Sequence, residues 1–370
     1  MSASPSEEQE QLRRLVHDFL QDRSPVADAR RLAESGADGD RAVWTQMAEQ
    51  LRLQALVVPE EHGGDGYGPA ELGIVLEQMG GVLLVSPYFA TVAMAAQTLI
   101  ASGDETAMRR WLPGIADGAT TATLALAEDS GAWDAGLVRT QARSSGDAWL
   151  LTGSKSFVVH GHTADLVLVV ARTPDGVGVF AVEADAPGLT RAPMDVLDPT
   201  RPLATVQLDE TPATRVGTGD ASGWLASVTD LVLAASAAEQ VGGAAACLAM
   251  AVDYAKVREQ FGRPIGSFQA IKHKCSTMLL QVECGRSAAY AAGAAVATPG
   301  PEASTAAAVA KAYCSQAFTH VAKECLQIHG GVGFTWEHDA HLYLRRAKSS
   351  ELLFGSPASH RARLAELVGI

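Results

Sequence analysis

The chain has 370 residues, 47% of them hydrophobic and 19% charged, so it can form a large core in two or three domains, and wholesale disorder is not expected. Its 29 lysines and arginines stand against 42 aspartates and glutamates, a formal net charge of −13 that no basic block offsets. Nonspecific binding to nucleic acid or to an anionic membrane is therefore not expected.

The cysteine pattern and the N-terminal segment indicate a reduced, cytoplasmic protein. The odd number of cysteines and the absence of a CxxC pair predict buried, reduced thiols at Cys247, Cys275, Cys284, Cys314 and Cys325. The first residues are polar and acidic, unlike a signal peptide. Residues 79–103 are uncharged, but Pro87 interrupts them, so they predict buried helices and no membrane span.

Residues 1–120 predict an N-terminal α-helical domain. Apolar residues at the i, i+3, i+4, i+7 and i+8 spacing of a helix stripe are Leu12, Leu15, Val16, Phe19 and Leu20. Further helices are expected at 41–52, 70–79, 87–101 and 105–116.

The pattern changes near residue 121 to short β-prone segments separated by turn-forming residues. These segments are 123–127, 137–143, 149–152, 156–159, 166–171, 178–182 and 203–208. Because no helix is predicted between them, residues 121–217 are expected to form a central antiparallel β-barrel or sandwich.

Helical patterns return in residues 218–370. Four long segments rich in Ala and Leu, at 225–258, 267–296, 302–328 and 338–350, predict a C-terminal four-helix bundle. The fold class is therefore α+β, with the element types in the order α, β, α.

Generic nucleotide and metal motifs are weak in this sequence. The GxGxxG fingerprint is absent, and the glycine-rich run at 330–333 follows a predicted helix instead of a strand. His160 and His162 would share one face of a strand, and Cys325 and His329 lie one helical turn apart. Neither pair has a third ligand nearby in sequence, so no metal site is expected.

The most specific segment is YAKVREQFGRPIGSFQ at 254–269. An arginine at a helix end, followed by a Gly-Pro turn and a new helix, can present positive charge and backbone N–H groups to a phosphate. The segment closely resembles the signature of acyl-CoA dehydrogenases, flavoproteins that desaturate acyl-CoA thioesters. Other segments that resemble this family are VPEEHGGDG at 58–66, LALAEDSGAWD at 124–134, LTGSKSFVVHG at 151–161 and QIHGGVGF at 327–334.

The resemblance implies FAD as the cofactor, with the flavin ring in one subunit and the other end of FAD clamped by a neighbouring subunit. The positions that match the clamp are Arg258, Gln260, Phe261, Phe268, Gln269, Gln327, Ile328 and Gly331. Arg258 would meet the pyrophosphate. On the ring side, Phe157 keeps the aromatic character of the family's ring neighbour, and Ser356 stands where the family has Thr.

Other positions depart from the family pattern. The reaction needs a carboxylate that removes the α-proton of the thioester while the β-hydride passes to the flavin. Phe354 occupies the usual position of this base, and Val232 the alternative position on an earlier helix. Trp133 replaces the usual Ser in the loop after the substrate strand, and Val159 replaces the usual Thr beside the ring.

Two carboxylates are weak candidates for a relocated catalytic base. Glu239 lies two turns beyond Val232, about 10 Å along the helix axis, and Glu351 precedes Phe354 by three residues. For both, a helix-surface or interface charge is the favoured interpretation, so the catalytic residue is left unassigned.

Retention of the clamp together with loss of the base resembles the assembly of actinobacterial acyl-CoA dehydrogenases of steroid side-chain catabolism, which are α2β2 heterotetramers. We expect this chain to be the FAD-clamping subunit, active on acyl-CoA only with a homologous, unlike partner. One alternative is a self-sufficient homotetrameric dehydrogenase with a relocated Glu base. Others are a non-redox scaffold or acyl-CoA-binding protein and a flavin-dependent oxidase. The resemblance also allows an electron-transfer flavoprotein as a partner.

Overall fold

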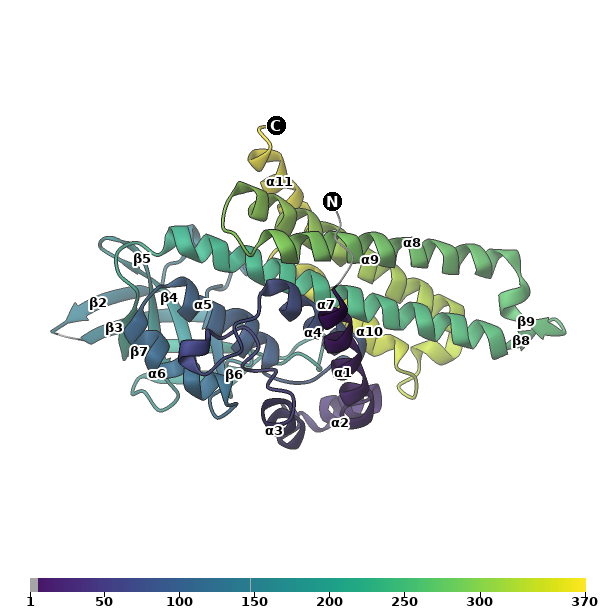
Figure 1. Ribbon diagram of the computed structural model, residues 1–370, viewed down its shortest axis with the longest axis horizontal. Coiled ribbons are helices and arrows are strands. Elements are labelled where there is room, and N and C mark those ends of the chain that lie inside the picture. The colour runs from purple at the N-terminus through teal and green to yellow at the C-terminus, as the bar shows by residue number, and fades with distance from the viewer. Residues whose placement is uncertain (1–5, 147) are drawn as a thin grey trace.

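The computed structural model describes residues 6–146 and 148–370, in which helices occupy both ends of the chain and strands the middle (Figure 1). The N-terminal helices are α1 (Glu7–Arg23), α2 (Val26–Ser35), α3 (Arg41–Glu49), η1 (Glu60–His62), α4 (Pro69–Gly81), η2 (Phe89–Ala96), α5 (Gln97–Ala101) and α6 (Glu105–Ala116).

Local capping explains where several of these helices begin. Ser6 and Gln9 form a capping box at the start of α1, and Asp40 and Asp104 cap α3 and α6 through backbone N–H groups. Helix α2 was not predicted, because it is only ten residues long, half of them charged or polar, and only Ala29 and Leu32 are buried. The predicted helix at 87–101 is a wholly buried π-helical segment that continues into α5.

Seven strands form the central sheet: β1 (Ala122–Ala125), β2 (Gln141–Ser145), β3 (Ala148–Val159), β4 (Leu166–Thr173), β5 (Gly176–Glu183), β6 (Leu189–Pro193) and β7 (Leu203–Val216). The order is β1-β4-β2-β3-β7-β5, and β5 also pairs with β4, so the sheet closes into a barrel. Most pairs are antiparallel as predicted, but β1 and β2 pair with β4 in parallel. The barrel interior includes Val167, Val169, Phe180 and Val206.

Three sequence predictions for the sheet differ from the structure. The strand expected at 137–143 begins only at Gln141, because Asp134 caps a short 3-10 turn before it. The segments 149–152 and 156–159 are one strand, β3, whose register shifts at Gly153 and again near Phe157. Strand β6 was missed, because it is a short and mostly exposed edge strand that ends in proline.

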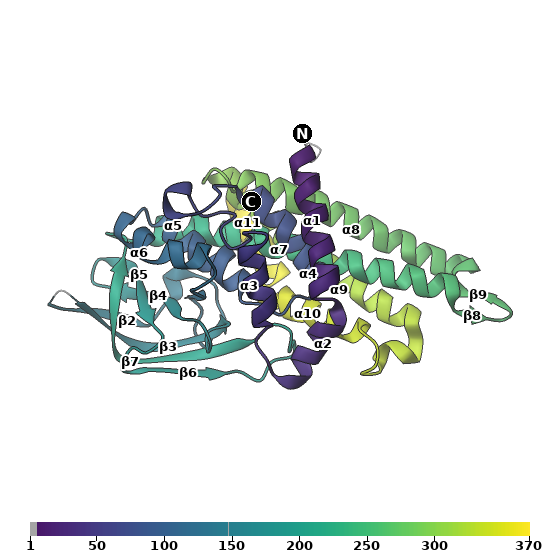
Figure 2. The ribbon, with the colours of Figure 1, turned by 60° about the horizontal axis from the view of Figure 1, so that its bottom comes forward.

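The C-terminal part contains α7 (Ser222–Val257), the hairpin strands β8 (Glu259–Gln260) and β9 (Arg263–Pro264), η4 (Ile265–Ser267), α8 (Gln269–Ala295), α9 (Pro301–His329), η5 (Gly330–Phe334), α10 (Ala340–Leu352) and α11 (Pro357–Leu367). Helix α11 adds a short helix to the four that the sequence predicted. Helix α7 runs from the barrel to the hairpin, and α8 and α9 lie alongside its second half (Figures 1 and 2).

Glycines set the close packing of α7 against α4. A Cβ at Gly242 would lie 1.8 Å from the Glu77 carbonyl oxygen, and a Cβ at Gly80 would lie 2.0 Å from the Glu239 carbonyl oxygen. The two helix backbones therefore touch where no side chain fits.

Helix α7 is long and apolar enough to cross a membrane, but 83% of its most apolar stretch is buried inside the protein. This burial identifies it as the central helix of the fold. The prediction of buried thiols is correct for Cys247, Cys314 and Cys325, whereas Cys275 is partly exposed and Cys284 is exposed. The last two thiols lie on the outer side of α8, whose apolar stripe is narrow.

Candidate active site

An aromatic cluster fills the junction between the barrel, the N-terminal helices and the C-terminal helices. The rings of Phe89 and Phe354 stack with centroids 5.7 Å apart, and Trp133 contacts Phe354 edge-on at 4.7 Å. Phe354 is only 3% exposed and has a left-handed backbone, with φ of 64°. The residue at the expected base position is thus an aromatic ring buried against two others.

The loop that carries Trp133 is fastened at its base by Glu128. This carboxylate accepts hydrogen bonds from the backbone N–H groups of Arg139 and Thr140, from the Thr140 hydroxyl and, at 2.9 Å, from Lys155. Burial opposes ionisation, but the bonds from Thr140 and Lys155 prevail and lower the pKa of Glu128 to about 2. Trp133 is therefore presented to the junction by an anchored loop.

Four buried charged side chains lie beside this cluster. Arg201 pairs with Glu239, and Arg346 bridges Glu239 at 3.3 Å and Asp198 at 2.5 Å. The Arg201 guanidinium also lies over the ring of Phe89, 5.1 Å from its centroid. Two positive and two negative charges thus neutralise one another in the interior, as buried ions require.

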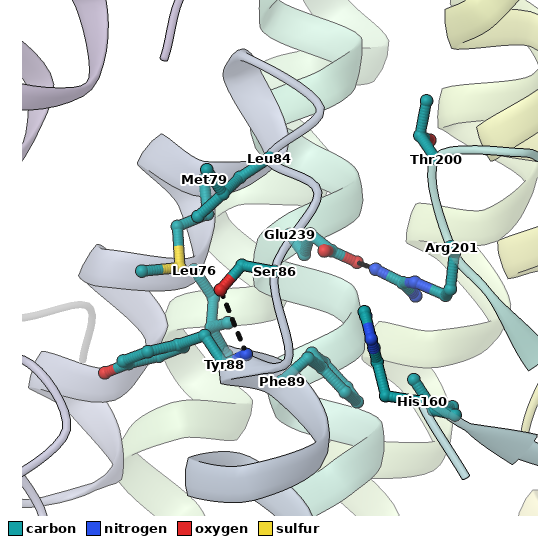
Figure 3. Close-up of a pocket in the computed structure, with 11 residues that line it drawn as sticks. Leu76, Met79, Leu84, Ser86, Tyr88, Phe89, His160, Thr200, Arg201 and Glu239 are labelled. Carbon is teal, nitrogen blue, oxygen red and sulfur yellow. Dashed lines mark hydrogen bonds and ion pairs between the residues drawn. The ribbon is translucent and has the colours of Figure 1, made fainter. Parts of the chain in front are cut away.

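A small cavity lies between this charge cluster and the N-terminal helices (Figure 3). Its volume is about 10 Å³, room for one water, and its polar lining includes Ser86, His160, Thr200, Arg201 and Glu239. Burial lowers the pKa of His160 to about 3, so its imidazole is neutral at pH 7. Within the described part of the chain, His160 Nδ1 and Arg201 Nη1 have no hydrogen-bond partner.

The two carboxylates considered as relocated bases are both engaged elsewhere. Glu239 is 6% exposed and is bound by the guanidinium groups of Arg201 and Arg346. Glu351 points toward α9, where it accepts hydrogen bonds from Thr319 at 2.9 Å and Lys348 at 2.5 Å. Although burial opposes it, these contacts lower the pKa of Glu351. Both carboxylates are therefore occupied by ion pairs or hydrogen bonds within the chain, and neither is free to face a substrate.

The remaining ring-side positions are structural. Val159 and Val232 are buried in the main hydrophobic core, and Phe157 is partly buried against the backbone of Gly131. Ser356 is the N-cap of α11 and accepts a hydrogen bond from the Ser359 backbone N–H at 3.2 Å. The two expected base positions therefore hold Phe354 and Val232, and neither side chain can accept a proton.

The C-terminal end of α7 and the hairpin that follows it are open to solvent and carry most of the predicted clamp residues. Phe261 and Gly262 form the turn between β8 and β9, with φ of 55° and 74°, which is a type I′ geometry that favours Asn-Gly. Phe261 is 92% exposed, and Phe268 contacts it edge-on at 6.1 Å. A large apolar ring held in a left-handed turn and exposed to water is suited to contact with another molecule.

Arg258, Gln260 and Gln269 are exposed around the same turn, and the described residues place no carboxylate on the Arg258 side chain. The end of α9 reaches this region, because the Tyr254 and His329 rings stack 4.4 Å apart.

Gln327 and Gly331 are exposed at this end of α9, but Ile328 is 6% exposed and packs inside a core cluster. Seven of the eight predicted clamp residues are thus exposed or partly exposed, five around the hairpin and two at the end of α9.

The chemistry of these residues fits the non-ring end of FAD. The Arg258 guanidinium, which pairs with no carboxylate in the described residues, suits a pyrophosphate, and the exposed amide groups suit the ribose and adenine edges. The exposed Phe261 ring suits the apolar parts of the dinucleotide, whereas the Phe268 ring is partly exposed and has the Arg263 guanidinium 4.1 Å from its centroid. A Cβ at Gly331 would meet nothing within 4 Å, so its backbone is open to a ligand.

Sequence reasoning missed Phe89, Asp198, Arg201 and Arg346. The one available signal was Glu239 itself, because a carboxylate inside a long apolar helix needs a buried positive partner. Which residue supplies that partner depends on how the loop before β7 and helix α10 meet α7.

Comparison with known proteins gives consistent results along the chain. Residues 6–119, 123–210 and 228–369 match, in order, the N-terminal, middle and C-terminal domain families of acyl-CoA dehydrogenase. Acyl-CoA dehydrogenase IpdE2 of Mycolicibacterium smegmatis is 33% identical over 359 residues, which cover 97% of this chain and 98% of that protein.

Two similar solved structures are a two-protein complex and a steroid acyl-CoA dehydrogenase. The ChsE4–ChsE5 complex from Mycobacterium tuberculosis has a chain of 28% identity with a TM-score of 0.91, covering 100% of this chain and 99% of that one. A variant of the Tcur3481–Tcur3483 steroid acyl-CoA dehydrogenase is 30% identical with a TM-score of 0.88, covering 98% of both chains.

Proposed function

The chain belongs to the acyl-CoA dehydrogenase family, and from this premise we propose that it is the FAD-clamping subunit of a heteromeric enzyme and lacks a catalytic base of its own. The family consists of FAD-dependent oxidoreductases that act on CH–CH bonds. FAD, when bound, accepts the hydride that leaves Cβ of the acyl-CoA thioester.

The observation that carries this proposal is the contrast between the ring side, beside Glu239 in the middle of α7, and the clamp, at the C-terminal end of α7. The clamp end is exposed, has an unpaired arginine and presents two aromatic faces. The ring end has Phe at the base position, and both nearby candidate carboxylates are tied to cations. The chain is therefore suited to hold one part of FAD, but its own ring side lacks the base that the reaction needs.

The distance between the two ends supports a cofactor shared between subunits. Nineteen residues of α7 separate Glu239, beside the aromatic cluster, from Arg258 at the clamp, and this corresponds to about 28 Å of helix. We infer that the clamp of this chain serves a flavin whose ring lies in a neighbouring subunit.

Within such a complex, the residues of this chain bind and orient the cofactor. Arg258 supplies a charge-assisted donor to the pyrophosphate, and Gln269 and Gln327 supply amide groups to the dinucleotide. Phe261 and Phe268 pack against its apolar parts and exclude water from it. Proton abstraction from Cα belongs to the partner.

The partner that we propose is a homologous acyl-CoA dehydrogenase chain in an α2β2 assembly, in the cytoplasm, with an electron-transfer flavoprotein as electron acceptor. The solved ChsE4–ChsE5 complex is a heteromeric neighbour of this kind. A steroid-derived acyl-CoA is the substrate class that we favour, because the Tcur3481–Tcur3483 enzyme is described as a steroid acyl-CoA dehydrogenase.

Expression of the chain alone and together with the homologous chain encoded beside its gene tests the proposal. We expect no flavin absorbance and no acyl-CoA turnover from the chain alone, and a yellow, active complex from the pair. Full flavin occupancy with turnover by the chain alone would reject the proposal in favour of a homotetramer.

Arg258→Leu in the co-expressed complex should lower flavin occupancy at least ~10-fold, because it removes the charged donor to the pyrophosphate. The matched control is Lys256→Leu, which removes a positive charge two residues earlier. If both variants retain flavin like the unaltered complex, the clamp assignment of Arg258 is wrong.

The homotetrameric alternative has its own test. If the chain alone is active, Glu239→Gln or Glu351→Gln should reduce kcat at least ~100-fold where that residue is the base. Loss of that size in one variant, with normal folding, would identify the relocated base.

A further inference from the structure

We propose that the acyl pocket of this chain is closed from within by Phe89, Trp133 and Phe354, and that the Arg201–Glu239–Arg346 ion pairs hold this aromatic cluster shut. The subunit is thus excluded from catalysis sterically as well as chemically. The inference deepens the proposed function, on which it rests for the location of the reacting site.

The aromatic cluster lies at positions that, by the family resemblance, belong to the reacting site. Phe354 occupies the base position, and Trp133 lies in the loop that corresponds to the family's flavin- and substrate-contacting loop. A thioester bound at this junction would have to occupy space that these two side chains fill. In this chain their rings are in direct contact, with centroids 4.7 Å apart, and Phe89 stacks on the other side of Phe354.

The cavity beside the aromatic cluster is too small for an acyl chain. The cavity next to Phe89 holds about 10 Å³, enough for one water. Pockets that bind small organic ligands commonly measure hundreds of Å³. Of the three aromatic residues only Phe89 lines this cavity, so an acyl chain could enter it only if Phe89 moved.

Buried ion pairs oppose movement of the Phe89 side chain. Arg201 lies over the ring of Phe89 and pairs with Glu239 (Figure 3). Arg346 pairs with the other carboxylate oxygen of Glu239 and is itself held by Asp198 and Thr200. Moving Phe89 would disturb a buried ion network in which each charge has its partner inside the protein, and such networks resist disruption. Glu239 acts here as a positioning residue.

Trp133 is the weakest part of the closure. Its indole Nε1 is buried and has no hydrogen-bond partner in the described residues. A buried unpaired N–H is unfavourable. Replacement of Trp133 by a small residue loses the packing of the indole but also removes this unfavourable N–H, so the net cost to stability is reduced. Trp133 is also only partly buried, which makes its replacement compatible with folding.

The test compares butyryl-CoA binding by calorimetry to the chain alone and to its variants. We expect no measurable binding to the unaltered chain and none to Phe354→Glu, because a new carboxylate leaves the pocket filled. The double variant Trp133→Ser with Phe354→Ala should bind butyryl-CoA with an affinity at least ~10-fold above the detection limit, which the unaltered chain should not reach. The control is Trp149→Ser with Phe334→Ala, which removes the same residue types outside the junction.

Butyryl-CoA binding to the unaltered chain at one molecule per chain would overturn closure, and this measurement needs no variant. Turnover by Phe354→Glu alone, or failure of a folded double variant to bind, would overturn it too. The flavin content of the co-expressed complex tests the clamp separately. Closure can therefore fail while the clamp stands, and the reverse.

Discussion

At the scale of single residues, the interior of this protein is organised by charges inside an apolar core. Asp198, Arg201, Glu239 and Arg346 are each nearly inaccessible to water and are held by one another. Burial of a complete network is tolerated, whereas loss of one member leaves an uncompensated charge. These positions should therefore respond to substitution more strongly than the surface ion pairs.

Arg346→Met should destabilise the fold by about 3–5 kcal/mol, because it leaves Asp198 and half of the Glu239 charge without a partner. The matched control is Arg345→Met, which removes a partly exposed guanidinium above Trp336 and should change stability by less than about 1 kcal/mol. Urea unfolding at pH 7 measures both. Equal effects would show that the buried network contributes nothing special.

The buried imidazole of His160 predicts a pH dependence of stability. Burial lowers its pKa to about 3, with His162 and Arg201 acting in the same direction. As the pH falls through about 6.5, the unfolded chain takes up a proton that the folded chain refuses until near pH 3. Stability is therefore complete above about pH 6.5 and falls toward pH 3, by about 2 kcal/mol between pH 6.5 and 5.

His160→Asn should remove much of this decline, and Asn tolerates the left-handed backbone at this position, where φ is 51°. A part should remain, because burial also lowers the pKa of His360 to about 4. The control is His273→Asn on the exposed side of α8, which should leave the decline unchanged. Urea unfolding at pH 7, 6 and 5 measures it, and an undiminished decline in His160→Asn would contradict the assignment.

At the scale of elements, α7 connects the aromatic junction near Glu239 with the hairpin at Arg258. It is held by backbone contact with α4. The contact depends on glycines, since side chains at Gly80 or Gly242 would overlap carbonyl oxygens of the facing helix. An interior helix packed this closely has little freedom to adjust. Its register fixes Glu239 against the barrel and Arg258 at the hairpin at the same time.

Gly242→Ala should therefore destabilise the protein by about 1–3 kcal/mol or more, despite the better helix propensity of Ala. Gly223→Ala, in the first turn of the same helix, meets nothing within 4 Å and should be neutral or stabilising by up to about 1 kcal/mol. Thermal unfolding of the two variants makes the comparison. A neutral Gly242→Ala would mean that the α4–α7 contact is looser than the structure shows.

At the scale of the whole molecule, the chain has an aromatic junction filled by side chains beside the middle of α7. It has an exposed hairpin at the C-terminal end of the same helix (Figure 1). The exposed end contains a conformation that the isolated chain does not favour. Phe261 adopts a left-handed backbone in a turn that Asn would occupy with less strain. We infer that contacts with another molecule compensate for this strain.

Phe261→Asn should therefore stabilise the isolated chain by up to about 1 kcal/mol while lowering the flavin content of the co-expressed complex. Urea unfolding measures the first effect and flavin absorbance per complex the second. Phe334→Asn, another exposed aromatic, should not stabilise the chain, since Phe334 is absent from the left-handed positions. If Phe261→Asn changes neither quantity, Phe261 has no role at an interface.

The sequence by itself determined the order of helices and strands, the family and the positions at which the family pattern is kept or lost. These are local properties, since periodicity, turn residues and motifs at fixed spacing lie along the chain. Tertiary structure alone decided that Glu239 is bound by Arg201 and Arg346, that Ile328 is buried, and that Phe89, Trp133 and Phe354 meet. Those contacts join residues 38 or more positions apart, and their geometry depends on how α7 packs against its neighbours, which no local pattern encodes.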